Sequence, residues 1–263
     1  MELAIAELPE SAGEDRALAS DSGVVVLDGA SSHEPGTPPA GRYVDILGSQ
    51  LVTSLGRADA LPEILSGAIR STVEVLDLRP NSSPSSAVAI VQVRPKTVEV
   101  LVLGDTTVVV GFADGRHDVI TDNRLNALDI PESSEYRKRL AEGSGYDDIH
   151  RGLVGELQRR QRVQRNRIGG YWIAEADPAA AEHAISATYP CESVAWVVVA
   201  TDGAYDTLEA LGVQWPEVAG RSTVGLRALL SRCREWEAET DPAGRILPRA
   251  KRHDDKTIAV LRL

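Results

Sequence analysis

The chain is poor in several residue types, and each shortage narrows what the protein can be. It has 263 residues but only two cysteines, Cys191 and Cys233, which lie far apart and show no metal-ligand spacing. Two isolated thiols favour a reducing compartment over a disulfide framework. Aromatic residues make up 4% of the chain and hydrophobic residues 43%, so aliphatic side chains must fill most of the core.

Long apolar runs and an excess of positive charge are also missing. No stretch approaches the roughly 20 apolar residues that cross a bilayer, which argues against a membrane span. The first 15 residues contain acids and no basic segment, so they do not resemble a signal peptide. The formal net charge of −11 argues against a general nucleic-acid or anionic-membrane binder. A soluble cytoplasmic protein without nucleic-acid or membrane partners is expected, and its oligomeric state stays open.

Apolar periodicity predicts strands that come in groups, with pairs of helices between them. The expected strands are residues 3–8, 16–20, 24–28, 87–93, 98–104, 107–112, 117–121, 183–190, 194–201 and 257–263. The expected helices are residues 43–55, 61–78, 149–167, 204–211 and 223–239. Residues 87–121 resemble a β-meander, because hairpin signals join the short strands there. Grouped strands and paired helices favour an α+β layered sandwich over a doubly wound parallel sheet.

Acidic residues stand at the ends of several apolar runs that are typical of buried strands. These acids are Asp28, Asp105, Asp202 and Asp254, and the pair Glu14-Asp15 lies near the N-terminus. Clustered carboxylates repel one another unless cations neutralise them. Oxygen anions on a rigid scaffold are also the ligands that hard divalent metals prefer. The acid pattern therefore predicts a divalent-metal site.

An aspartate followed by glycine is usually only a turn, and the chain offers an internal comparison. The Asp-Gly pair at 114–115 lies between two short strands in a polar stretch, so a hairpin turn is expected there. The pairs at 28–29 and 202–203 instead follow apolar runs. If a helix begins near 203, Asp202 and Asp206 share one helix face, because they are four residues apart.

The order of these motifs resembles the metal-dependent protein phosphatase 2C (PPM) family, in a divergent bacterial form. The family pattern comprises Asn-Glu-Asp, a strand ending in Asp-Gly-x-Gly, Gly-Asp-Ser, Ser-Asp-Gly followed by Asp, and a terminal Asp-Asn-x-Thr strand. The counterparts are Gly13-Glu14-Asp15, Asp28-Gly29-Ala30-Ser31, Gly104-Asp105-Thr106, Thr201-Asp202-Gly203 with Asp206, and Asp254-Asp255-Lys256-Thr257. The resemblance covers essentially the whole chain, and its strength lies in five short motifs in the right order.

The resemblance implies a four-layer αββα sandwich of two mostly antiparallel sheets flanked by pairs of helices. It implies one phosphatase domain over residues 1–263, with an Arg-rich insertion at about 122–171, here named the flap. It further implies two Mn²⁺ or Mg²⁺ ions and a weaker third site, with Asp28 bridging the first two ions. The catalytic set would be Asp28, Asp202 and Asp254, and the metal set Glu14, Asp28, the Gly29 carbonyl, Asp105, Asp202, Asp206 and Asp254.

The reaction implied by the resemblance is hydrolysis of phosphoserine or phosphothreonine in proteins by a metal-bridged water. One alternative stays open from a different class: a catalytically weak phosphatase-fold protein that binds or regulates phosphoproteins. Another two-metal phosphoesterase, such as a nuclease, is disfavoured because phosphate contacts along a nucleic acid demand a basic surface.

Some positions depart from the family pattern. Glu10 stands where the family usually places an arginine that clamps the phosphate, and an acid there would repel phosphate. Gly13 replaces the motif asparagine and Ser31 replaces a glycine. Ala30 stands where eukaryotic members carry a proton-donating histidine, which bacterial members often lack.

Arg16 and Arg165 are the candidate replacements for the missing phosphate-binding arginine. Arg165 belongs to an Arg-rich stretch that is either a solvated helix face or a source of guanidinium groups for phosphate. His33 is either a proton donor to the leaving group or a loop residue without a role. His253 adjoins Asp254 and is a candidate for orienting that carboxylate.

Overall fold

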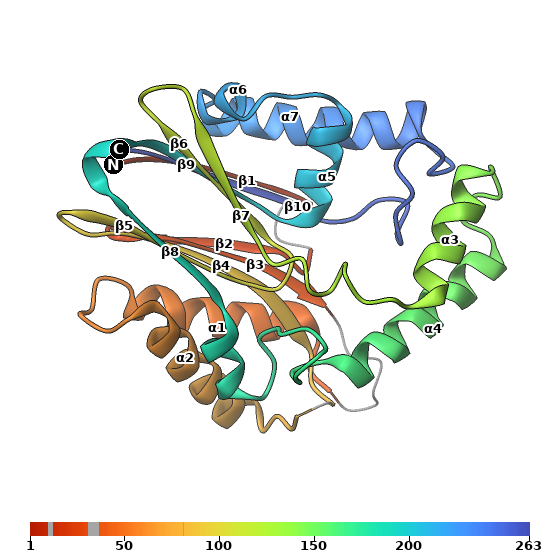
Figure 1. The fold of residues 1–263 in the computed structure, drawn as a ribbon, viewed down its shortest axis with the longest axis horizontal. Helices are drawn as coiled ribbons and strands as arrows, with labels where there is room; N and C mark the ends of the chain where they lie inside the picture. Colours follow the sequence, from red (N-terminus) through yellow and green to blue (C-terminus); the bar gives the residue numbers. More distant parts are fainter. Residues whose placement is uncertain (10–12, 31–36, 81) are drawn as a thin grey trace.

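The computed structural model describes residues 1–9, 13–30, 37–80 and 82–263 of the chain. Its centre is a pair of five-stranded sheets stacked face to face, with helices on both outer faces (Figure 1). Every pairing between neighbouring named strands is antiparallel. The expected α+β four-layer arrangement is confirmed. Glu10, Ser31 and His33 lie outside the described residues.

Each sheet combines strands from distant parts of the chain. Sheet 1 contains, in spatial order, β1 (Glu2–Leu8), β10 (Lys256–Arg262), β9 (Val194–Ala200), β6 (Thr107–Phe112) and β7 (His117–Thr121). Sheet 2 contains β2 (Arg16–Ser20), β3 (Gly23–Ala30), β4 (Ser85–Val93), β5 (Thr97–Leu103) and β8 (Ile185–Pro190). The N- and C-terminal strands pair directly, so β1 closes onto β10.

Side chains along the central strands alternate between two cores, because successive residues of a strand point to opposite faces. In β3, Val24 and Val26 belong to the core between the sheets, whereas Val25 and Leu27 pack towards the helices. The fully buried members of the core between the sheets are all aliphatic, which explains how the chain manages with few aromatic residues. The alternation directs Asp28 to the inter-sheet side, near the end of its strand.

Helices cover both outer faces of the sandwich. Sheet 2 is covered by α1 (Ala40–Ser54) and α2 (Leu61–Leu76), and sheet 1 by α5 (Asp202–Ala210), α6 (Trp215–Ala219) and α7 (Thr223–Glu235). A π turn, Trp236–Thr240, continues α7, and short 3-10 turns occupy Pro178–His183 and Cys191–Ser193. Within the described ranges, no helix has the length and apolar character needed to cross a membrane.

The flap contributes two further helices that lie beside the sandwich (Figure 1). They are α3 (Pro131–Ala141) and α4 (Asp148–Gln164). Their own small core contains Ile130, Tyr136, Leu140 and Leu157. Ala250, from the loop that precedes β10, packs against this core, so the flap contacts the loop that carries Asp254.

One expectation for the middle of the chain is wrong, and one helix there was not expected. Residues 87–121 do not form one meander, because β4 pairs with β5 in sheet 2 whereas β6 pairs with β7 in sheet 1. The chain crosses between the sheets after Gly104, whose φ of +85° turns the backbone there. The sequence analysis also did not predict α3, because that helix is mostly polar and buries only Tyr136 and Leu140.

Candidate functional site

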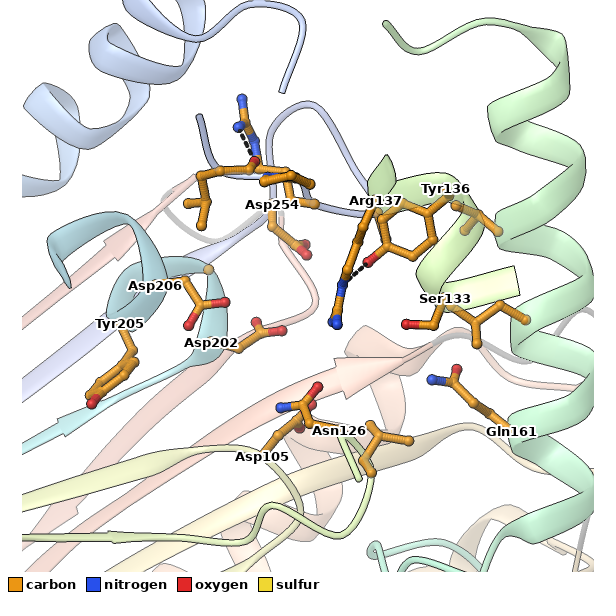
Figure 2. Close-up of a pocket in the computed structure, with 18 of the residues that line it drawn as sticks. Asp105, Asn126, Ser133, Tyr136, Arg137, Gln161, Asp202, Tyr205, Asp206 and Asp254 are labelled. Carbon is orange, nitrogen blue, oxygen red and sulfur yellow. Dashed lines mark hydrogen bonds between the residues drawn. The ribbon is translucent and has the colours of Figure 1, made fainter. Parts of the chain in front are cut away.

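The aspartates at the strand ends meet at one edge of the sandwich. Asp28 lies near the end of β3, Asp105 on the crossing between the sheets, Asp202 at the start of α5 after β9, and Asp254 just before β10. We name these strand ends and loops the rim. All four residues line a chamber of about 190 Å³, named the inner chamber. Figure 2 shows Asp105, Asp202, Asp206 and Asp254 around a common space.

Burial and mutual repulsion raise the pKa values of three rim carboxyl groups, those of Asp28, Asp105 and Asp202. The pKa of Asp28 lies well above its usual value because of burial, with the charges of Asp15 and Asp202 adding to the effect. Burial and the charge of Asp202 raise the pKa of Asp105 to about 7. Burial and the charge of Asp254 raise the pKa of Asp202, whose side chain is hydrogen-bonded to Asp28. A bound cation would favour the ionised forms of all these groups.

Asp206 shares a helix with Asp202, as expected from their spacing. Both residues belong to α5, four positions apart, and both line the space shown in Figure 2. Loss of hydration raises the pKa of Asp206 to about 6, and the charge of Asp202 adds to it. One helix therefore delivers two carboxyl groups to the site.

The glycines after Asp28 and Asp202 mark places where two acid-bearing segments touch. A Cβ atom on Gly29 would lie 2.5 Å from the carbonyl oxygen of Glu14, and one on Gly203 would lie 2.2 Å from that of Asp255. Only glycine lets these backbones approach so closely. Gly115 differs, because it has a φ of +86° and its Cβ would meet no described atom within 4 Å. It forms the hairpin turn between β6 and β7, which confirms that prediction.

The N-terminal loop supplies a buried acid, Asp15, to which the sequence analysis assigned no ligand role. Asp15 is 6% exposed, and its Oδ2 accepts a hydrogen bond of 2.9 Å from Oγ1 of Thr201. Burial raises the pKa of Asp15 to about 8, and the charge of Asp202 adds to the rise. The signal was present in the sequence, because Asp15 directly precedes the strand at 16–20.

The predicted ligand Glu14 lies next to the terminal acid pair. Its backbone amide donates a hydrogen bond of 2.6 Å to Oδ2 of Asp255. The same oxygen lies 2.6 Å from the position that a Cβ on Gly13 would occupy. The Asp255 carboxylate therefore fills the space that a side chain at position 13 would need, which explains the glycine there.

A buried ion-pair network braces α5 against the loop before β10. Glu237, in the π turn after α7, is 1% exposed. Its Oε1 accepts from Nζ of Lys256 at 2.6 Å and from Oγ1 of Thr207 at 3.1 Å, and its Oε2 lies 3.0 Å from Nδ1 of His253. Buried charges are tolerated when they are paired in this way. The sequence analysis did not predict this network, because charged residues such as Glu237 and Lys256 are usually exposed to solvent.

The two candidate phosphate-binding arginines have different surroundings. Arg16 donates from Nε to Asp45 at 2.6 Å and from Nη1 to two carbonyl oxygens of the N-terminal loop, so it braces that loop against α1. Arg165 lines the inner chamber, and its Nη1 lies 3.1 Å from Oε1 of the buried Glu175. His253, the candidate partner of Asp254, bonds instead to Glu237.

A second chamber of about 460 Å³, named the outer chamber, lies between the flap and the rim. It shares Asp105, Asp202 and Asp254 with the inner chamber. Arg137 of α3 points into it in Figure 2, and Nε of Arg137 lies 3.3 Å from the hydroxyl of Tyr136. The cleft is therefore acidic on the sandwich side and carries a guanidinium group on the flap side.

The donors of the inner chamber fit a hard divalent cation. Its described lining supplies carboxylate oxygens and neither histidine nor cysteine, a set that Mg²⁺ and Mn²⁺ prefer. Oγ of Ser85 is buried at the chamber wall and has no hydrogen-bond partner among the described residues. This hydroxyl group could therefore form a hydrogen bond with a bound ligand. No described group of three or more acids, histidines or cysteines is already arranged as a set of metal ligands.

Comparison with known proteins identifies the fold. The sequence matches no protein-family model and no curated protein. The Ser/Thr phosphatase Stp1 from Staphylococcus aureus is 11% identical, with a TM-score of 0.55 over 100% of this chain and 94% of that one. The PPM Ser-Thr phosphatase MsPP from Mycobacterium smegmatis, solved with cacodylate, is 16% identical, with a TM-score of 0.52 over 100% and 98%.

A third structure is the catalytic domain of the phosphatase PstP in complex with two manganese ions. It is 13% identical, with a TM-score of 0.50 over 98% of this chain and 96% of that one. The chain thus has the fold of PPM-type Ser/Thr phosphatases along nearly its whole length.

Proposed function

We propose that the protein is a metal-dependent phosphatase that hydrolyses phosphoserine and phosphothreonine in protein substrates. The observation that carries this proposal is the meeting of Asp28, Asp202 and Asp254, from three remote segments, in one chamber lined by oxygen donors. The PPM phosphatase fold supports the same activity. The flap belongs to the same proposed domain and borders the outer chamber.

Each rim residue has a proposed role as a ligand. Asp28, Asp202 and Asp254 form the catalytic set, and the full set of metal donors is Glu14, Asp28, the Gly29 carbonyl, Asp105, Asp202, Asp206 and Asp254. When bound, two Mn²⁺ or Mg²⁺ ions would lower the pKa of a water molecule and neutralise charge on the phosphoryl group. Asp105 and Asp206, with Asp202, form the weaker third site.

The chain itself would orient the substrate and hold the ligands in place. The Glu237 network and the close contacts at Gly29 and Gly203 fix the acid-bearing segments relative to one another. Arg165 is better placed than Arg16 to bind phosphate, because it lines the inner chamber and Tyr171 and Glu175 hold its guanidinium group.

Single-turnover hydrolysis of a phosphopeptide, with and without Mn²⁺, tests the proposal. We expect Mn²⁺-dependent turnover that falls by about 1000-fold or more in Asp202→Ala, because that change removes a shared ligand. Asp114→Ala is the matched control: it removes an exposed aspartate from a hairpin turn and should leave turnover unchanged.

Two other outcomes would point elsewhere. Mn²⁺ binding without turnover in the wild-type protein would support the catalytically weak binding protein. Turnover that does not depend on a divalent metal, or that persists in Asp202→Ala, would exclude the proposed site.

A further inference from the structure

Lys251 places an ammonium group beside a proposed metal ligand. Its Nζ donates a hydrogen bond of 2.7 Å to Oδ1 of Asp254, and its side chain is 55% exposed. Lys251 also lines the inner chamber together with Asp28 and Gly29. The motifs of the sequence give this lysine no role.

Several carboxylates act on this ammonium group. Partial burial alone would lower the pKa of Lys251, but the charge of Asp254 and the hydrogen bond to it outweigh burial. The charges of Asp28 and Glu14 add to this effect, and the pKa is raised. Lys251 is thus a positively charged side chain at neutral pH, held within the field of the proposed metal site.

The backbone on both sides of Lys251 is fixed. The carbonyl oxygen of Ala250 lies 2.9 Å from Nε2 of His150 in the flap, and Ala250 packs against the flap core. Arg249 donates from Nε to the carbonyl oxygen of Arg252 at 3.0 Å. A fixed backbone with a flexible four-carbon stem lets the ammonium group exchange partners while it stays in the chamber.

A divalent cation and Lys251 would meet the same acceptor. Oδ1 of Asp254 accepts from Lys251 and also from the backbone amide of Asp255, at 3.0 Å. A cation that uses this oxygen as a ligand must displace the ammonium group, because two positive charges cannot share one site without strong repulsion. Once displaced, the ammonium group would still border the chamber that contains Asp28.

We propose that Lys251 is an exchangeable counter-ion of Asp254. It pairs with this carboxylate until a divalent cation binds there, and the released ammonium group then binds the phosphoryl group of the substrate. This role rests on the metal site of the proposed function. It supplies the positive charge that Glu10, at the phosphate-clamping position of the family, cannot provide. Arg165 is paired with Glu175 and Arg16 with Asp45, and neither acid is a proposed metal ligand, so metal binding would release neither guanidinium group.

Calorimetric titration with Mn²⁺ tests the competition. We expect Lys251→Gln to bind Mn²⁺ about 3- to 10-fold more tightly than the wild-type protein, because a competing cation and its repulsion are removed. Arg252→Gln removes the same charge from the next residue and should change the Mn²⁺ affinity by less than about 2-fold, because charge at an exposed position is screened.

Titration of the Mn²⁺-saturated protein with inorganic phosphate tests the second role. Lys251→Gln should bind phosphate about 3- to 10-fold more weakly, since a charge-assisted hydrogen bond is lost. Lys251→Arg keeps the charge and should bind phosphate within about 2-fold of the wild-type protein.

The outcomes separate this role from the proposed function. If the wild-type protein binds Mn²⁺ and Lys251→Gln binds it equally or more weakly, the counter-ion role is wrong. The proposed metal site would not be affected by that result. Tighter Mn²⁺ binding with unchanged phosphate affinity would overturn the phosphate-binding role. A wild-type protein that binds no Mn²⁺ would overturn the metal site itself, and the role of Lys251 with it.

Discussion

The rim and the flap face each other across the outer chamber, but they are held in place differently. The rim rests on strands that are buried on both faces, and its glycines allow direct backbone contacts. The flap has a small core of its own and half-exposed ion pairs, such as Arg160 with Glu132 at 3.0 Å. Exposed ion pairs contribute only about 0–1 kcal/mol each. The flap therefore depends on its core, on its contact with Ala250, and on the buried ion pair of Arg165 with Glu175.

Under the proposed function, this difference would suit the two regions to separate tasks. Groups that react must stay within a fraction of an ångström of a productive geometry, which a doubly buried sheet provides. Groups that accommodate a peptide substrate tolerate more movement, and a helix pair with few core contacts suits them. Three changes would break or sharpen this distinction.

The largest difference in turnover is expected between two glycine-to-alanine variants, one in the rim and one in the flap. Gly203→Ala would push a Cβ atom against the Asp255 carbonyl, displace Asp202, and lower Mn²⁺ affinity and turnover by roughly 10- to 100-fold. Gly155 lies in α4, where the Cβ would meet no described atom within 4 Å. Gly155→Ala should leave turnover unchanged and stabilise α4 by up to about 1 kcal/mol. Calorimetric titration measures the Mn²⁺ affinity of each variant, and thermal melts measure its stability. Equal losses of Mn²⁺ affinity in the two variants would contradict the difference between rim and flap.

An intermediate effect is expected when the pH is changed in the presence of a chelator, and the quantity affected is the free energy of unfolding. Burial raises the pKa of Asp15 to about 8 and that of Asp105 to about 7, against an ordinary value of 3.8. Between pH 5 and pH 8 the folded protein then binds more protons than the unfolded chain. The free energy of unfolding should therefore fall as pH rises, by at least about 1 kcal/mol over that range.

Urea unfolding in EDTA at pH 5 and at pH 8 measures this loss. Saturating Mn²⁺ should remove it, because a bound cation favours the ionised carboxylates. A profile that is flat in EDTA would mean that the rim acids are already ionised without a cation. Such a result would contradict the burial argument.

The smallest effect on turnover is expected from loosening the flap. Leu140 is fully buried in the flap core, so Leu140→Ala should cost about 2–5 kcal/mol of local stability. Amide exchange should become faster in α3 and α4 while β9 and β10 stay protected. Turnover of a small phosphate ester should change by less than about 3-fold, because the rim is untouched. Loss of protection in both regions would show that flap and sandwich unfold as one unit.

Much of the sandwich could be predicted because its signals are local. The strands at 16–20, 107–112 and 117–121 have the predicted bounds, since apolar periodicity and turn residues delimit them. The acids at 28, 105, 202 and 254 were selected because each stands at the end of an apolar run. Their meeting in one chamber followed from the resemblance to a known fold, because local patterns do not say which strand ends are neighbours.

The remaining features depend on contacts between distant segments. The sequence pattern predicts a hairpin at the crossing between β5 and β6, because strands that are buried on both faces have similar sequences whichever sheet they join. The pairing of Glu237 with Lys256 could not be predicted, since burial of a charge depends on its partner. Lys256 lies on the helix side of β10, like Ile258, and that placement is visible only once the sheet is known.

The alternation along β3 restricts how chains of this kind can diverge. One residue inserted between Val24 and Asp28 would turn the aspartate away from the gap between the sheets and towards α1. Replacing one aliphatic residue by another would leave the aspartate where it is. Stp1 has the same fold at 11% identity over 100% of this chain, so most side chains of the sandwich differ between the two proteins.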